Sequence, residues 1–182
     1  MKITRLAIPD ICLIEPQVFG DVRGFFVSTW QDDAFRRDVA DVTFVQDNQS
    51  RSRLGTIRGL HFQAAHTQGK LVRCPFGRIW DVVVDVRRSS PTCGQWVSTE
   101  LSESNHRQLW VPPGFAHGFL VLSELADLQY KVTDRYDQGS EVTLQWNDPA
   151  LGIPWPLPDG VAALLAEKDQ RGTPFSALPL LP

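Results

Sequence analysis

The sequence predicts a single all-β domain, built as a jelly roll or closed barrel with a few short helices. Short runs of alternating apolar and polar residues recur along the 182-residue chain, as expected for strands with one buried face. Thirteen glycines and thirteen prolines supply turns, and most lie between these runs. Eight or so strands favour closure, because a closed sheet has no exposed edges. We expect residues 1–182 to form one domain, since domains typically span about 100–150 residues.

The clearest predicted strand covers residues 78–86, RIWDVVVDV. Every second side chain from Trp80 to Val86 is apolar and falls on one face, whereas Asp81 and Asp85 fall on the other. The same alternation predicts further strands over residues 43–47, 70–74, 96–101, 108–111, 119–122, 128–133 and 142–146.

Helix signals are few. Asp32 or Asp33 is positioned to cap a short helix that ends at Ala40, and Asp159 to cap a second one over residues 161–167. The proline-rich end, TPFSALPLLP, predicts an extended strap that lies on the body of the domain.

Composition argues against several classes of protein. A net charge of −3 and a pI near 5.8 provide no basic field for nucleic acid, although a local cationic pocket stays compatible with them. No run approaches the roughly 20 apolar residues of a membrane span, and the first residues resemble no signal peptide. The three cysteines are widely spaced and form no CxxC pair, which favours reduced thiols and a cytoplasmic location.

The densest polar region runs from Gln46 to Arg73. Gln46 and Asn48 share a strand face, so both are able to point into a barrel. Arg58 and His61 are three residues apart and lie on opposite faces of a regular strand, so a shared cavity requires a bulge or kink at Gly59. Residue types alone favour a structural interpretation, in which these polar residues are solvated on a sheet edge and His61 is a packed core histidine.

Tyr130 lies in a run where Leu128, Tyr130 and Val132 alternate inward. An inward tyrosine usually packs and finds one hydrogen bond, so it suggests chemistry only where a cavity and a base lie opposite. Four cations, Arg23, Arg58, Lys70 and Arg73, suffice to neutralise a diphosphate if they converge, which spacing does not establish.

Residues 111–119, VPPGFAHGF, contain a P-x-G-x-x-H turn that ends at His117. This turn resembles the second motif of the cupin superfamily, whose small barrels often hold a metal. The first cupin motif needs an H-x-H pair, but here the matching positions contain His61 alone. Two isolated histidines make a poor metal site, so we expect no metal.

Taken together, the segments resemble the dTDP-4-dehydrorhamnose 3,5-epimerase family over nearly the whole chain. The pairing of RGLHFQ with PPGFAHGF is specific, and the other segments occur in the family's order. The matching stretches are residues 19–26, 44–50, 58–63, 68–73, 81–87, 108–119, 129–133, 146–148 and 167–169. The resemblance implies a cupin-type jelly roll that epimerises carbons 3 and 5 of a dTDP-4-keto-6-deoxyhexose without a cofactor.

The resemblance also implies catalytic roles. His61 would be the base, with Asp169 holding the ring and stabilising its charged form. Tyr130 would return a proton from the opposite face, and Lys70 would stabilise the enolate. The ligand-binding positions implied by the family are Phe19, Arg23, Gln46, Asn48, Arg58, His117, Tyr136 and Lys168. Phe19 and Arg23 would act across a homodimer, because the family's N-terminal segment reaches into a neighbouring subunit.

Two positions depart from the family pattern. Ser28 stands where a glutamate is common, and Ala166 where a hydroxyl side chain is common. Four other functions stay open: a single-position epimerase, a 3,4-ketoisomerase, a silent sugar-nucleotide-binding barrel and a metal-dependent cupin oxygenase. Retention of His61 and Tyr130 favours epimerisation, and the missing H-x-H pair disfavours the oxygenase.

Overall fold

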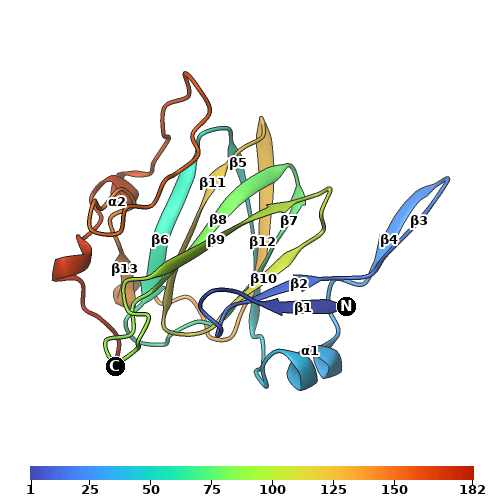
Figure 1. Cartoon of the computed structure of the whole chain (residues 1–182), viewed down its shortest axis with the longest axis horizontal. Coiled ribbons are helices and arrows are strands. Elements are labelled where there is room, and N and C mark those ends of the chain that lie inside the picture. Colours follow the sequence, from blue (N-terminus) through green and yellow to red (C-terminus); the bar gives the residue numbers. More distant parts are fainter.

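Two antiparallel sheets face each other and enclose the main apolar core (Figure 1). The structure is a computed structural model that describes residues 1–182. One sheet contains, in spatial order, β1 (Lys2–Arg5), β2 (Cys12–Glu15), β10 (Gln108–Val111), β7 (Lys70–Phe76), β12 (Leu125–Val132) and β5 (Gln46–Arg53). The other contains β13 (Glu141–Thr143), β6 (Ile57–Gln63), β11 (Phe115–Val121), β8 (Arg78–Asp85) and β9 (Trp96–Ser102). The all-β architecture predicted from the alternating runs is confirmed, and its strands form two facing sheets.

The helices are short and lie outside the sheets. They are α1 (Asp32–Asp38), α2 (Glu167–Gln170) and two 3-10 turns, η1 (Gln138–Ser140) and η2 (Phe175–Ala177). The first helix is present as predicted, and its Phe35 packs against Trp110 of the first sheet. Its predicted cap and end are wrong, because Gln31 is the N-cap, Asp32 and Asp33 lie in the first turn, and the helix ends at Asp38 and not at Ala40. No helix of the chain is long and apolar enough to cross a membrane.

Both faces of β8 are buried, and this gives its alternating pattern a different meaning from that of a surface strand. Ile79 and Val83 join the core between the sheets, so the intervening Asp81 also points there. Val82 and Val84 pack on the outside against the C-terminal segment. The aspartate face is therefore the inner face of the barrel.

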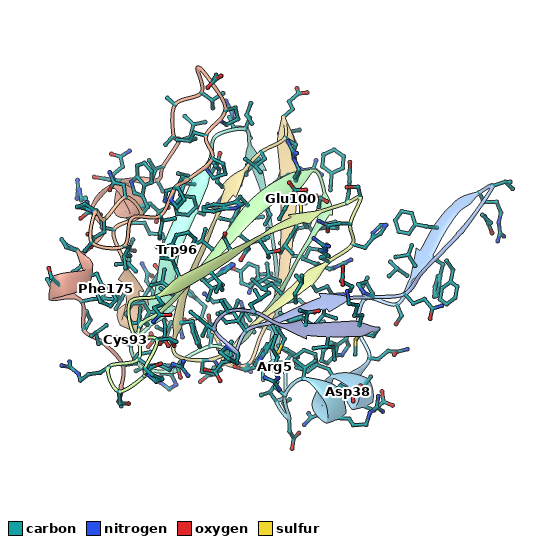
Figure 2. The ribbon with its side chains drawn as sticks, viewed as in Figure 1. Arg5, Asp38, Cys93, Trp96, Glu100 and Phe175 are labelled. Carbon is teal, nitrogen blue, oxygen red and sulfur yellow. The ribbon has the colours of Figure 1, made fainter.

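The C-terminal segment, residues 144–181, covers the outer face of the second sheet. Figure 2 shows Trp96 of β9 and Phe175 on this side of the molecule, and the Trp96 indole donates a 2.9 Å hydrogen bond to the carbonyl of Leu151. The predicted packing of the proline-rich end on the body is confirmed, since Leu178 and Leu181 are buried, but the strap is not extended throughout, because η2 forms within it.

The predicted helix over residues 161–167 is wrong. Leu164 instead exchanges backbone hydrogen bonds with Gly55 and Ile57, where β6 begins. These pairings hold the segment in an extended form, and a helix forms only at α2.

Several predicted strand bounds shift. The predicted strand 43–47 becomes β5, which runs on to Arg53 through almost wholly polar residues on a sheet edge. The predicted strand 119–122 corresponds to β11, which begins earlier, at Phe115. Its start was not predicted because all of β11 is buried and lacks alternation. Strand β6 was not predicted, because most of its residues are buried on both faces, and neither were the four N-terminal strands, which are only four residues long each.

A hairpin of β3 (Val18–Asp21) and β4 (Gly24–Val27) projects away from the body of the molecule (Figure 1). Its aromatic side chains are largely exposed: Phe19 by 56%, Phe25 by 63% and Phe26 by 69%. Arg23, near its tip, forms an ion pair with Asp21.

Candidate active site

A cavity of about 560 Å³ opens between the two sheets, and ten of the twelve predicted site residues line it. The predicted residues in its wall are Gln46, Asn48, Arg58, His61, Lys70, His117, Tyr130, Tyr136, Lys168 and Asp169. They come from five different strands, from the segment before β13 and from α2. The fold therefore gathers polar groups that are up to 123 positions apart in the chain, from Gln46 to Asp169.

Gly59 explains how Arg58 and His61 reach the same cavity. The pairing of β6 with β11 shifts register between His117 and Phe119, opposite this glycine. Gly59 has a φ of 115°, and a side chain there would lie 2.6 Å from the Cα of Gly118. The bulge expected from the three-residue spacing is therefore present, and only glycine fits it.

His61 forms a close pair with Asp169 at one side of the cavity. Its Nε2 lies 2.5 Å from a carboxylate oxygen of Asp169. The histidine side chain is 20% exposed and that of Asp169 only 2%. Asp169 comes from α2, so the C-terminal segment supplies half of this pair.

A second pair lies on the neighbouring strands. His117 Nε2 is 2.9 and 3.0 Å from the two carboxylate oxygens of Asp81, and both residues are buried. Burial raises the pKa of the Asp81 carboxyl, although His117 and Lys70 oppose that shift. No role was predicted for Asp81; its signal was a carboxylate that shares the inner face of a largely apolar strand with Asp85.

Lys70 lies beside both pairs. Its Nζ donates to the backbone carbonyl of His61 at 3.3 Å. Burial lowers the pKa of Lys70 to about 8, while the negative charge of Asp81 raises it in part. The amine is therefore mostly protonated at neutral pH and places a positive charge in a dry site.

Tyr130 of β12 lines the cavity together with Leu128, its neighbour on the same strand face. The inward orientation predicted from the alternation is confirmed for both residues. Burial raises the pKa of the Tyr130 phenol, so the group carries its proton at neutral pH.

Three side chains interact at the cavity mouth. Lys168 Nζ lies 2.8 and 2.9 Å from the carboxylate oxygens of Glu141, which also accepts a 3.3 Å hydrogen bond from the Tyr136 hydroxyl. Burial disfavours ionisation of Glu141, but the Lys168 hydrogen bonds and the nearby His61 outweigh it and lower its pKa. Glu141 was missed because the strand predicted over residues 142–146 starts one residue earlier, so that Glu141 fell outside it.

Two predicted residues lie elsewhere in the chain's own structure. Phe19 and Arg23 belong to the projecting hairpin and do not line this cavity. Among the four cations considered from the sequence, Arg58 and Lys70 converge, whereas Arg73 lies in a groove on the outer face, bonded to Gln129. The unusual Ser28 also lies outside the cavity, while the unusual Ala166 lines it.

The cavity thus combines a carboxylate-paired histidine, a protonated phenol and a buried ammonium group. Such a set is able to remove a proton, return one and stabilise negative charge that develops between the two steps. No three His, Cys, Asp or Glu side chains gather closely enough to hold a metal ion.

Comparison with known proteins identifies the family. The profile of the dTDP-4-dehydrorhamnose 3,5-epimerases matches residues 5–177. The chain belongs to this epimerase family. It is 55% identical to the dTDP-4-dehydrorhamnose 3,5-epimerase of Pseudomonas aeruginosa, over 97% of each chain. It is 47% identical to the enzyme of that name from Escherichia coli, over 94% of this chain and 92% of the other.

Solved structures of the epimerase family share the fold. The enzyme of Legionella pneumophila in complex with dTDP-4-keto-L-rhamnose superimposes with a TM-score of 0.96 at 44% identity, over 99% of this chain and 97% of that one. A 3'-monoepimerase from Streptomyces bikiniensis, in complex with dTDP-quinovose, gives 0.87 at 29% identity, over 94% and 87%. The cupin-type jelly roll implied by the sequence motifs is confirmed.

Proposed function

We propose that the protein is an isomerase that inverts carbons 3 and 5 of dTDP-4-dehydro-6-deoxyglucose to give dTDP-4-dehydrorhamnose, with no cofactor. The observation that carries this proposal is a histidine–carboxylate pair and a protonated tyrosine in the wall of one cavity, next to a buried lysine. The 3,5-epimerases among its relatives, at up to 55% identity, support the same activity.

The substrate's chemistry suits these groups. Carbons 3 and 5 flank the ketone at carbon 4, so removal of either proton leaves an enolate whose charge resides on the ketone oxygen. His61 takes the proton on the ring nitrogen that does not face Asp169, and Asp169 stabilises the resulting imidazolium. Tyr130 then donates its proton to the opposite face of the same carbon, which inverts the centre.

Lys70 stabilises the enolate. Its ammonium group is buried beside the backbone of His61, where its charge acts through a medium of low dielectric. His117, held by Asp81, lines the same part of the cavity and binds the sugar.

The nucleotide end of the ligand binds toward the cavity mouth. Arg58 and Lys168 provide positive charge for the diphosphate, and Tyr136 provides an aromatic face at the mouth. Gln46 and Asn48, joined by a 2.7 Å hydrogen bond, add polar groups on the opposite wall.

We also propose that two chains form a homodimer in which the β3–β4 hairpin reaches the partner's cavity. Exposed Phe19, Phe25 and Phe26 support this, because a cluster of exposed aromatic side chains on a projecting hairpin usually marks a contact surface. Arg23 would then bring its charge to the partner's diphosphate. Sedimentation of the wild-type chain and of Phe25→Ser tests the dimer; a monomeric wild-type enzyme with full activity would contradict it.

A cytoplasmic location belongs to the same proposal. It is supported by three free cysteines, two of them buried, which suit a reducing compartment.

The decisive experiment for the activity is incubation with the dTDP-4-keto sugar in heavy water, followed by NMR. We expect deuterium at both carbon 3 and carbon 5, with rhamno product accumulating. Label at only one carbon would make the protein a single-position epimerase, like the relative from Streptomyces bikiniensis. Absence of label would overturn the enzymatic proposal and leave a silent binding module.

A further inference from the structure

The side chain of Gln63 forms hydrogen bonds with two loops, the one between β6 and β7 and the one that follows β12. This residue ends β6 and is only 4% exposed. Its Nε2 donates to the backbone carbonyls of His66, at 2.7 Å, and Arg135, at 3.3 Å, while its Oε1 accepts from the N–H of Asp137 at 2.9 Å. One buried amide therefore satisfies three backbone groups that otherwise lack a partner in regular structure.

Two of these three hydrogen bonds bracket Tyr136. The carbonyl of Arg135 and the N–H of Asp137 are the backbone groups on either side of it, so Gln63 holds this position from both ends. The Tyr136 ring is 52% exposed, and its hydroxyl donates one long hydrogen bond, to Glu141 at 3.3 Å. Since its own contacts are few, its place at the cavity mouth depends on the backbone that carries it.

We propose that Gln63 is a positioning residue that prepares Tyr136 to receive the nucleotide end of the ligand. The proposal rests on the proposed function, because it takes the ligand to be a dTDP sugar. Gln63 is absent from the cavity wall, so it acts through Tyr136 and not by touching the ligand. A loop held in its bound form before binding lowers the entropic cost of association, so the effect falls on affinity.

The test is the substitution Gln63→Met, which keeps the volume and removes all three hydrogen bonds. We expect the Kd for dTDP, measured by calorimetry, and the KM for the dTDP-4-keto sugar to rise about tenfold. We expect kcat to change by less than about twofold, because His61, Lys70 and Tyr130 keep their contacts. The double variant with Tyr136→Ala should bind dTDP no more weakly than Tyr136→Ala alone, since the two residues act on one interaction.

Gln145→Met is the matched control. The Gln145 amide donates only to Asn147 and does not line the cavity, so this variant should bind dTDP like the wild-type protein. If Gln63→Met does not fold, Gln63→Glu replaces it, because the carboxylate keeps the acceptor for Asp137 but repels the carbonyls of His66 and Arg135.

A purely structural role would lower the melting temperature, leave the dTDP affinity of the folded protein unchanged and add to the effect of Tyr136→Ala. That result, with a wild-type protein that binds dTDP and turns over the sugar, would overturn the positioning role alone. A wild-type protein that binds no dTDP would overturn the proposed function and this inference with it.

Discussion

The two histidine–aspartate pairs lie side by side yet are built differently. His61 and His117 face each other in the register of β6 and β11. His117 finds Asp81 on the adjacent strand β8, 36 residues away, and its side chain is 7% exposed. His61 finds Asp169 on α2, 108 residues away, and its side chain is 20% exposed. The first pair is enclosed by two strands, whereas the second is completed by a surface segment.

This difference assigns the two pairs different roles: one takes part in proton transfer, and the other holds a sugar-binding group in place. A base must reach its substrate and change charge during turnover, so it needs an accessible ring and a carboxylate that stabilises the imidazolium. His61 with Asp169 meets both conditions. His117 with Asp81 is fixed in the barrel wall by two strands, which suits a group that keeps one orientation while the sugar binds against it.

The largest expected effect comes from exchanging the two histidines for asparagine in turn. His61→Asn should lower kcat about 10³- to 10⁴-fold, because it removes the base while leaving the fold intact. His117→Asn should raise KM and lower kcat only about tenfold, since it alters sugar binding and not proton removal. Steady-state kinetics with a coupled reductase measures both. Equal losses of kcat in the two variants would remove the distinction between the pairs.

Tyr130→Phe separates proton removal from proton return. We expect kcat for product to fall about 10²- to 10³-fold, because no acid remains on the face opposite His61. His61 still removes and returns protons on its own face, so deuterium from heavy water should enter the substrate without inversion. NMR of the recovered sugar measures this exchange. A variant that neither exchanges nor inverts would assign Tyr130 to both steps.

The His117–Asp81 pair also affects the pH range of the reaction, because the charge of Asp81 acts on Lys70. Deprotonation of Lys70 removes the positive charge that stabilises the enolate. Because kcat/KM reports the groups of the free enzyme, it should fall roughly tenfold per pH unit above about pH 8, where burial has lowered the pKa of this lysine. The charge of Asp81 raises that pKa, so Asp81→Asn should move the alkaline limb to lower pH. An unchanged limb in this variant would mean that Asp81 acts on His117 alone.

The free energy of unfolding should rise with pH over the range in which activity falls. The pKa of Lys70 is about 8 in the folded protein and near 10.5 when exposed, so between these values the unfolded chain holds the extra proton. Stability from this group therefore rises with pH across that window. Lys70→Met should lack the rise, which denaturant unfolding at pH 8 and pH 10 detects.

Much of the fold was predictable because short alternating and apolar runs between turn residues mark strands, even where both faces are buried, as in β8. The strand at Gln108–Val111 matches its predicted bounds, and Gly59 forms the bulge that the spacing of Arg58 and His61 required. Two of the failures share one physical cause. Polar β5 and the extended segment at Leu164 are held by backbone pairing with distant strands, which leaves no local pattern.

The site residues also divide into those that a local sequence pattern predicted and those that it did not. Gln46 and Asn48 were predicted to share a face because both lie on one strand. Asp81, Glu141 and Gln63 escaped notice because their roles come from contacts between elements: a buried inner face, a three-residue strand and a loop 72 residues away. The pairing of His61 with Asp169 was reached only through resemblance to the family, since nothing local links the two.

The smallest expected effect concerns the segment that completes the His61 pair. Ala166 precedes α2 with the backbone angles of a helix cap, φ −68° and ψ 157°, but has no side chain to accept from the helix N–H groups. Ala166→Ser supplies that acceptor and should stabilise the protein by about 0.5–1 kcal/mol, a rise of roughly 2 °C in Tm. The gain should appear only for a hydroxyl side chain, so Ala166→Val, which adds bulk without an acceptor, is the control.

The serine variant should keep its kcat. Because the cap orders the helix that carries Asp169, it should also protect this residue from local opening, which a cap on another helix would not do. Hydrogen exchange at the Asp169 amide measures that protection, and slower exchange in the serine variant alone would link the stability of α2 to the integrity of the exposed pair.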